Sequence, residues 1–203
     1  MEEMIKWLGH ASVRIESDRV IYIDPWKIKS EKKADIILIT HDHYDHCSPE
    51  DIEKIKKEDT VVVAARNCAS KLKGEVKFVE KGEKFSEKGV VIEVLPAYNP
   101  TKNFHPPNYG GVGYIVETRG IRIYHTGDTD VIPEMKNLKV DVILVPVGGT
   151  YTMNAEEAAE LVNLLQPKLA IPIHYGSIVG SAQDAERFKR LCKVEVKILP
   201  IST

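Results

Sequence analysis

The sequence predicts a mixed α/β protein (α+β) in which two β-sheets pack face to face with helices outside them. Short apolar or alternating runs, typical of strands, dominate the early part of the chain, and strand–helix alternation follows. This order occurs roughly twice, and each time a strand–loop–helix unit carries polar residues at the end of its strand. The 203 residues, of which 43% are hydrophobic, can bury a substantial core, so we expect one domain over residues 1–203.

The first half of the chain is predicted to be rich in strands, which we expect at residues 6–9, 12–16, 20–23, 36–39, 60–65, 76–79, 83–85 and 90–95. A helix is predicted to begin at Ser48-Pro49-Glu50-Asp51 and to run to Lys56. Serine is a good N-cap, proline suits the first helical position, and the acids favour the positive end of the helix dipole. A short helix is expected at 67–72.

The second half is predicted to alternate strands with helices. We expect strands at residues 112–118, 121–124, 142–146 and 169–173, with a closing strand at 194–199. Helices are expected at 133–138, from the capping box of Asn154 and Glu157 to residue 166, and from Ser181 to about residue 191. Residues 96–111 form a long loop without a regular pattern, and such loops are often functional.

Composition narrows the class of function. The net charge is −2, so the chain carries no basic footprint for nucleic acid, although a local basic patch is compatible with a neutral protein. We see no signal peptide and no apolar run of membrane-spanning length. The three cysteines, Cys47, Cys68 and Cys192, are far apart and odd in number, which fits a reducing compartment rather than a disulfide framework. We therefore expect a cytoplasmic protein without a membrane partner.

The densest group of chemically active side chains follows the predicted strand at 36–39. Three histidines and two aspartates occupy six positions, from His41 to His46. In a tight loop His41 and His43 can point to one side, while Asp45 and His46 can be turned toward a second point close by. Imidazole nitrogens and carboxylate oxygens are ligands of zinc and similar ions. We predict a metal site here rather than a solvated polar loop.

Two more candidate ligands also lie at strand ends. Asp128 follows the strand at 121–124, where its carboxylate could bridge two cations, and Gly127 before it permits a sharp backbone bend. His174 follows the strand at 169–173. Taken singly, an aspartate of this kind more often caps a turn, and a histidine more often lies in the core. The seven histidines nevertheless share a placement in turns or at strand ends, at positions 10, 41, 43, 46, 105, 125 and 174.

Three of these motifs together resemble the metallo-β-lactamase-fold hydrolase superfamily. They are His41-x-His43-x-Asp45-His46, Thr126-Gly127-Asp128-Thr129 and Ile171-Pro172-Ile173-His174-Tyr175. Gly9-His10-Ala11-Ser12 and Asp24-Pro25 also resemble one branch, the ascorbate-6-phosphate lactonase-like proteins and predicted zinc-dependent hydrolases. The match covers nearly the whole chain.

The resemblance implies one metallo-β-lactamase-like domain over residues 1–203. It implies a four-layer αββα sandwich of two mixed sheets, with two divalent ions at one edge between the sheets. Zinc is the first choice, and manganese and iron are alternatives. By motif position, His41 and His43 would bind the first ion. Asp45, His46 and His174 would bind the second, and Asp128 both.

The chain departs from the family at one ligand. Relatives of this branch often place a third histidine for the first ion after Pro-Ala-x, whereas this chain has Pro96-Ala97-Tyr98-Asn99. We expect His105, six residues further on, to serve as a ligand or substrate contact. The alternatives are a weaker Asn99 oxygen ligand, a loosely bound first ion, or a single tightly held ion.

Other residues are expected to support the site. Metal-binding histidines and carboxylates need partners that fix their orientation, and His10 and His125 could provide such support or could simply pack in the core. Tyr109, Tyr151 and Tyr175 lie in loops expected to surround the site. They could donate a hydrogen bond to substrate or to a developing oxyanion, or could form only a packed aromatic rim.

These expectations describe a metal-dependent hydrolase. A metal-bound hydroxide would attack a small-molecule ester, lactone or phosphodiester, and Asp45 would act as a catalytic residue that accepts a hydrogen bond from the hydroxide. A nuclease or cyclic phosphodiesterase on the same fold is the first alternative. A non-catalytic metal-binding or sensing protein with a degraded first metal site is the second. Lactonase-like relatives also suggest a homo-oligomer.

Overall fold

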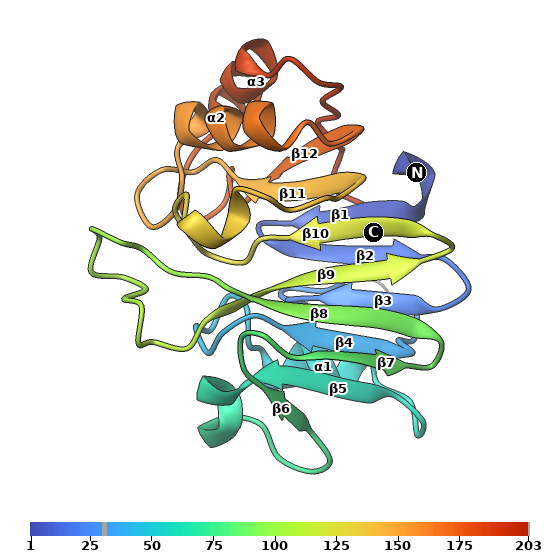
Figure 1. Ribbon diagram of the computed structural model, residues 1–203. Coiled ribbons are helices and arrows are strands. Elements are labelled where there is room, and N and C mark those ends of the chain that lie inside the picture. Colours follow the sequence, from blue (N-terminus) through green and yellow to red (C-terminus); the bar gives the residue numbers. More distant parts are fainter. Residues whose placement is uncertain (30–31, 203) are drawn as a thin grey trace.

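Two six-stranded sheets form the centre of the computed structural model, which describes residues 1–29 and 32–202 (Figure 1). The first sheet has the order β1 (Ile5–Gly9), β2 (Ser12–Glu16), β3 (Val20–Ile23), β4 (Ile36–Ile39), β5 (Val61–Ala65), β6 (Lys77–Val79). The second has the order β12 (Leu169–Ile173), β11 (Val142–Pro146), β10 (Ile121–His125), β9 (Val112–Thr118), β8 (Val90–Pro96), β7 (Lys84–Glu87).

Both sheets are mixed, as predicted. In the first sheet β1, β2 and β3 pair antiparallel, and β3 to β6 pair parallel. In the second sheet β7 to β10 pair antiparallel, and β10, β11 and β12 pair parallel. Each sheet therefore has parallel strands whose carboxyl ends can deliver side chains to a common edge.

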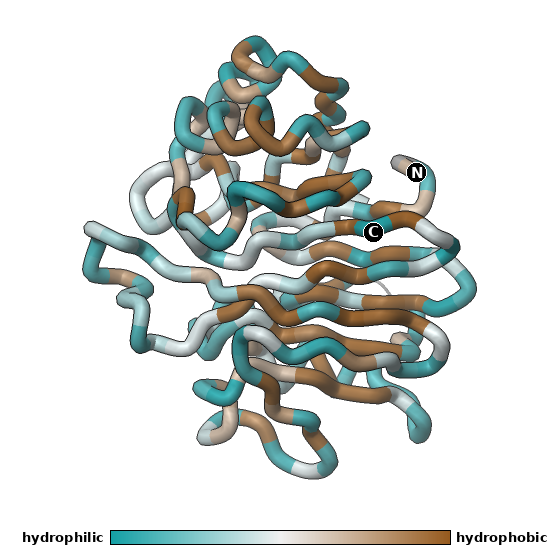
Figure 2. Tube along the Cα trace, in the orientation of Figure 1, coloured by the Kyte–Doolittle hydropathy of each residue, from teal (hydrophilic) through white to brown (hydrophobic). Residues whose placement is uncertain are grey.

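The continuous apolar strands lie at the centre of the sandwich. Every residue of β4, β11 and β12 is buried. The alternating residues of β8 are instead buried and half-buried in turn, as expected where only one face packs on the core. Figure 2 shows hydrophobic residues along the strands and hydrophilic residues at the turns and in the long loop after β8.

Helices α1 (Pro49–Ile55), α2 (Ala155–Leu165) and α3 (Ala182–Leu191) lie outside the sheets, with α2 and α3 beside β11 and β12 (Figure 1). Ser48 accepts a hydrogen bond from the Asp51 N–H and so caps α1. Asn154 and Glu157 form the predicted capping box of α2. No helix in the described part of the chain is long and apolar enough to cross a membrane.

Within the described residues, three shorter helical segments are 3₁₀ turns: Glu2–Met4, Arg66–Ser70 and Pro133–Met135. The last two replace the short helices that we predicted at 67–72 and 133–138. Such single turns are too short to show the periodicity that distinguishes an α-helix.

The predicted closing strand at 194–199 is wrong. Val196 makes one isolated bridge to Ala170 of β12, and Ile201 makes another to Trp7 of β1. Since β12 and β1 are edge strands of different sheets, the segment passes from one sheet edge to the other and pairs continuously with neither.

Candidate metal centre

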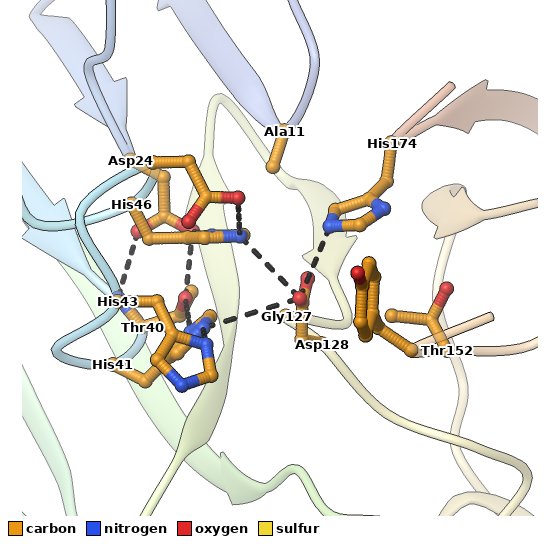
Figure 3. Close-up of polar contacts among 12 residues, drawn as sticks. Ala11, Asp24, Thr40, His41, His43, His46, Gly127, Asp128, Thr152 and His174 are labelled. Atoms are coloured by element: carbon orange, nitrogen blue, oxygen red, sulfur yellow. Dashed lines mark hydrogen bonds and ion pairs between the residues drawn. The ribbon is translucent and has the colours of Figure 1, made fainter. Parts of the chain in front are cut away.

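Loops that follow β4, β8, β10, β11 and β12 meet around a cavity of about 220 Å³. Side chains from four of these loops form its polar floor: His43, Asp45, His105, Asp128 and His174. Residues separated by more than 100 positions in the sequence therefore meet at one end of the sandwich (Figure 3).

A single carboxylate oxygen lies at the centre of this group. Asp128 Oδ2 is 3.1 Å from Nε2 of His174 and 3.4 Å from Nε2 of His46. The same oxygen is 3.6 Å from Nε2 of His105 and 3.9 Å from Nε2 of His41. It thus faces imidazoles from three other loops, which is the position that a ligand shared by two ions would occupy. Figure 3 shows His41, His46 and His174 around it.

The backbone before Asp128 requires glycine. Gly127 has φ +67°, and a Cβ at this position would lie 2.5 Å from the Val112 carbonyl oxygen. The turn is also held from outside the cavity by His125. Its Nε2–H donates to the Ala11 carbonyl at 2.9 Å, and its Nδ1 accepts from the Gly127 N–H at 3.2 Å.

Three ring nitrogens, from His41, His43 and His105, form what we call the histidine triad. His43 Nδ1 lies 3.1 Å from His41 Nε2 and 3.3 Å from His105 Nε2. Ligand nitrogens about 2.0–2.1 Å from a tetrahedral zinc ion are about 3.3–3.4 Å apart, so these spacings suit a metal. Burial lowers the pKa of all three imidazoles, which favours the neutral form that binds metals.

His105, rather than Asn99, lies in the triad. The Oδ1 of Asn99 accepts hydrogen bonds from both the main-chain N–H and the Nδ1–H of His105, each at 2.9 Å. The Nδ2 of Asn99 donates to the Tyr151 carbonyl at 3.0 Å. The carboxamide is therefore engaged beside the triad, and it fixes the tautomer of His105 that leaves Nε2 free to bind an ion.

A second group consists of Asp45, His46 and His174, with His10 beside it. The buried Nε2 atoms of His46 and His174, which face Asp128, make no hydrogen bond. Buried polar atoms are rarely left unpaired, so these nitrogens fit a metal ligand set.

The acidic members of the centre are held ionised by their neighbours. Burial alone would raise the pKa of Asp45, but the 2.8 Å hydrogen bond from His10 Nε2–H and the charge of His46 lower it to about 2. Burial would also raise the pKa of Asp128, and His174 and His46 together hold it well below its usual range. Both carboxylates are available as negatively charged ligands at neutral pH.

Asp24 supports both groups from beneath. Its carboxylate accepts from His46 Nδ1–H at 2.7 Å, from the Thr40 N–H at 2.8 Å and from the Thr40 hydroxyl at 2.6 Å. The same hydroxyl accepts from His41 Nδ1–H at 2.9 Å. One buried carboxylate thus orients His46 directly and His41 through Thr40 (Figure 3). Sequence reasoning did not assign this role to Thr40, although its place next to His41 was a signal.

Three residues of the centre have strained backbones. His10, Asp24 and His174 have φ of +52°, +49° and +58°. Such values are uncommon for residues other than glycine and tend to cluster at functional sites. The His10 carbonyl accepts from the His174 N–H and from Trp7 Nε1–H, each at 2.8 Å, and these bonds help to hold the strained conformations.

The predicted aromatic rim needs correction. Tyr151 lines the cavity, and Tyr175 does not. Tyr109 does not line it either, but its ring packs against the histidine triad, with its centroid 5.4 Å from that of His43 and 5.8 Å from that of His105. The Tyr109 hydroxyl donates to Asp42 outside the cavity, and Tyr175 stacks on Trp7 with ring centroids 4.8 Å apart. The other walls are Tyr44, Phe104 and Ile178, which sequence reasoning missed. Tyr44 lies within the histidine motif and Phe104 precedes His105, but no pattern marked Ile178.

The donors therefore fit divalent metal ions: imidazole nitrogens and ionised carboxylates, buried and partly without other partners. The two-sheet sandwich and this His/Asp cluster at its strand ends define a metal-dependent hydrolase of the metallo-β-lactamase fold. The chain belongs to the beta-lactamase superfamily, whose domain description, "Beta-lactamase superfamily domain", matches residues 4–174.

Two relatives and two solved structures show how far the similarity extends. UPF0173 metal-dependent hydrolases from Thermococcus kodakarensis and Pyrococcus furiosus are 37% and 34% identical, and the alignments cover 96% of this chain and 95% and 94% of theirs. A crystal structure from Parabacteroides distasonis, of a protein provisionally described as a metal-dependent hydrolase, is 36% identical. It has a TM-score of 0.87, over 98% of this chain and 93% of that one. Igni18, a metallo hydrolase from Ignicoccus hospitalis, shares the fold at 24% identity, with a TM-score of 0.81 over 98% and 95%.

Proposed function

We propose that this hydrolase holds two divalent ions, with zinc as the first choice, and cleaves a small-molecule ester, lactone or phosphodiester. In this proposal the histidine triad binds one ion, the second group binds the other, and Asp128 contacts both. The observation that carries the proposal is the position of Asp128 Oδ2, within 3.9 Å of imidazole nitrogens from both groups.

The bound ions would supply an activated water and would stabilise the negative charge that develops on the substrate. Asp45, ionised at neutral pH, would accept a hydrogen bond from the attacking water and so orient it. His10 would keep the Asp45 carboxylate in place through its 2.8 Å hydrogen bond. None of the described residues that line the cavity is a serine, threonine or cysteine, which favours direct attack by water over a covalent intermediate.

Two observations weigh against the alternatives. The sensing hypothesis was motivated by the missing third histidine of the first metal site. His105 supplies a ring nitrogen 3.3 Å from His43 Nδ1, which removes that motive. The nuclease hypothesis lacks a basic lining, because no lysine or arginine is among the described residues around the cavity.

The test is a hydrolysis panel on the zinc-loaded protein, containing p-nitrophenyl butyrate, a γ-lactone, a thioester and bis(p-nitrophenyl) phosphate. We expect turnover of at least one member, its loss with a chelator, and a fall of about 100-fold or more in Asp45→Ala. Asp42→Asn is the matched control, since Asp42 lies in the same loop but does not line the cavity. Zinc binding without turnover of any member would favour the sensing protein.

A further inference from the structure

We infer that the cavity selects substrates whose portion away from the scissile bond is compact, apolar and uncharged; this inference rests on the proposed function. Four side chains stand above the polar floor and form the walls: Tyr44, Phe104, Tyr151 and Ile178. They come from four different loops, so the apolar wall is assembled by the fold rather than by one segment of sequence.

Exposed apolar side chains concentrate at this cavity. Tyr44, Phe104 and Ile178 are 65%, 44% and 39% exposed, and they are three of the seven large hydrophobic side chains exposed in the described residues. Phe104 also packs edge-on against Tyr151, with ring centroids 4.7 Å apart. Single exposed apolar residues need no explanation, but a group around one cavity indicates a binding surface.

The walls carry no cationic side chain. None of the described residues that line the cavity is lysine or arginine. Lys102 lies on the same loop as Phe104, but its ammonium group is engaged by Asp130 Oδ1 at 2.5 Å and by the Thr152 carbonyl at 2.7 Å. A carboxylate or phosphate held against the walls, away from the floor, would lose water and would gain at most hydrogen bonds from the Tyr44 and Tyr151 hydroxyls, with no cationic side chain beside it, which is costly.

The size of the cavity limits the occupant. Its volume of about 220 Å³ is below the roughly 300–1,000 Å³ typical of sites for drug-sized ligands. We therefore expect a small acyl or alcohol group against the walls, with the reacting bond at the floor between Asp45 and Asp128.

The test compares methyl 4-acetoxybenzoate with 4-acetoxybenzoate, two esters that differ by a methyl group masking the distal carboxylate. Each kcat/KM is divided by the rate constant for cleavage of the same ester by hydroxide, which removes the difference in leaving group. We expect the neutral ester to be favoured at least about tenfold. Ile178→Lys should reduce this preference at least about fivefold by supplying a cation. Tyr44→Lys gives a second test if that variant does not fold.

Leu164→Lys is the matched control, because Leu164 is 56% exposed on α2 and does not line the cavity. Equal rates for the two esters, or faster cleavage of the anionic one, would overturn the inference and leave the hydrolase intact. Cleavage of bis(p-nitrophenyl) phosphate but of neither ester would also overturn the inference while the chain remained a hydrolase. If no substrate is cleaved at all, the proposed function itself fails. If Ile178→Lys lowers the molar mass in solution but leaves the ester preference unchanged, a second copy of the chain covers the wall and the inference is wrong.

Discussion

Asn99 Oδ1 lies 2.9 Å from Nδ1 of His105 and accepts a hydrogen bond from it. Asn99 occupies the position at which the family resemblance places a histidine ligand, and here it orients a histidine from six residues further along the chain. The long loop after β8 therefore supplies both the candidate ligand and the group that fixes its tautomer. This pair explains how the centre can be complete although the expected sequence position is not histidine.

The role of Asn99 predicts a selective loss of metal affinity. Asn99→Ala should weaken zinc binding at one site by about 10–100-fold, because His105 loses the acceptor for Nδ1–H, and should leave the other site nearly unchanged. Competition with a chromophoric chelator measures both affinities. Asn108→Ala, on an exposed residue of the same loop, is the control. If the zinc affinities of both sites are unchanged in Asn99→Ala, Asn99 does not support metal binding through His105.

The Thr40 hydroxyl predicts a coupling between metal binding and the core. Thr40→Val keeps the side-chain shape but removes the link from His41 to Asp24, so zinc affinity at the triad should fall about tenfold. The stability of the metal-free protein should fall by about 1–2 kcal/mol, since Asp24 loses a hydrogen bond. Thr60→Val is the control, because it removes a hydroxyl that donates to the Ala34 carbonyl away from the centre. It should reduce stability but leave the zinc affinity unchanged. Similar affinity losses in both variants would contradict the predicted coupling.

Two glycine substitutions separate backbone strain from steric clash. Gly127→Ala should cost about 3 kcal/mol or more, because the new Cβ would meet the Val112 carbonyl 2.5 Å away in a left-handed conformation. Gly89 also has positive φ, of +83°, but nothing lies within 4 Å of a Cβ built there. Gly89→Ala should therefore cost only about 1–2 kcal/mol. Urea unfolding of both variants checks the difference, and equal costs would mean that the turn relaxes.

Asp51 predicts a pH-dependent contribution to stability. Burial would raise its pKa, but hydrogen bonds from Ser48 and from the N–H groups of Ile28 and Lys27 hold it below the ordinary value of 3.8. The unfolded state therefore takes up the proton first, and stability from this group is present above pH 3.8 and lost as pH falls further. Asp51→Ala should cost about 2 kcal/mol at pH 7. In urea titrations, the difference in the free energy of unfolding between the wild type and Asp51→Ala should narrow as pH falls from 5 toward 3. A difference that widens instead would contradict the assignment.

Local patterns predicted the parts of the centre that one short segment encodes. His41, His43, Asp45 and His46 follow a continuous apolar strand, and the rigid end of that strand places them together. Asp128 and His174 could be predicted as site residues because they also follow strands. The family resemblance was needed to place them in one site with the histidine motif. His105 was harder to predict because its position depends on the path of a 15-residue stretch between β8 and β9, from 97 to 111.

Other features depend on partners that a local pattern does not contain. The alternation in 194–199 is typical of a strand, but it does not reveal that the segment passes between the edges of two sheets. Tyr175 follows His174 directly, yet the positive φ of His174 turns the chain and Tyr175 stacks on Trp7 instead. Ile178 lines the cavity from the loop after β12, and no sequence motif marks that position.

The central claim is that two groups of side chains hold two ions that share Asp128. Anomalous difference maps from zinc-soaked crystals, recorded on both sides of the zinc absorption edge, test it most directly. We predict two zinc peaks, one beside the histidine triad and one beside Asp45, His46 and His174, each with Asp128 as a ligand. A cavity without zinc, or ions that do not contact Asp128, would contradict the account.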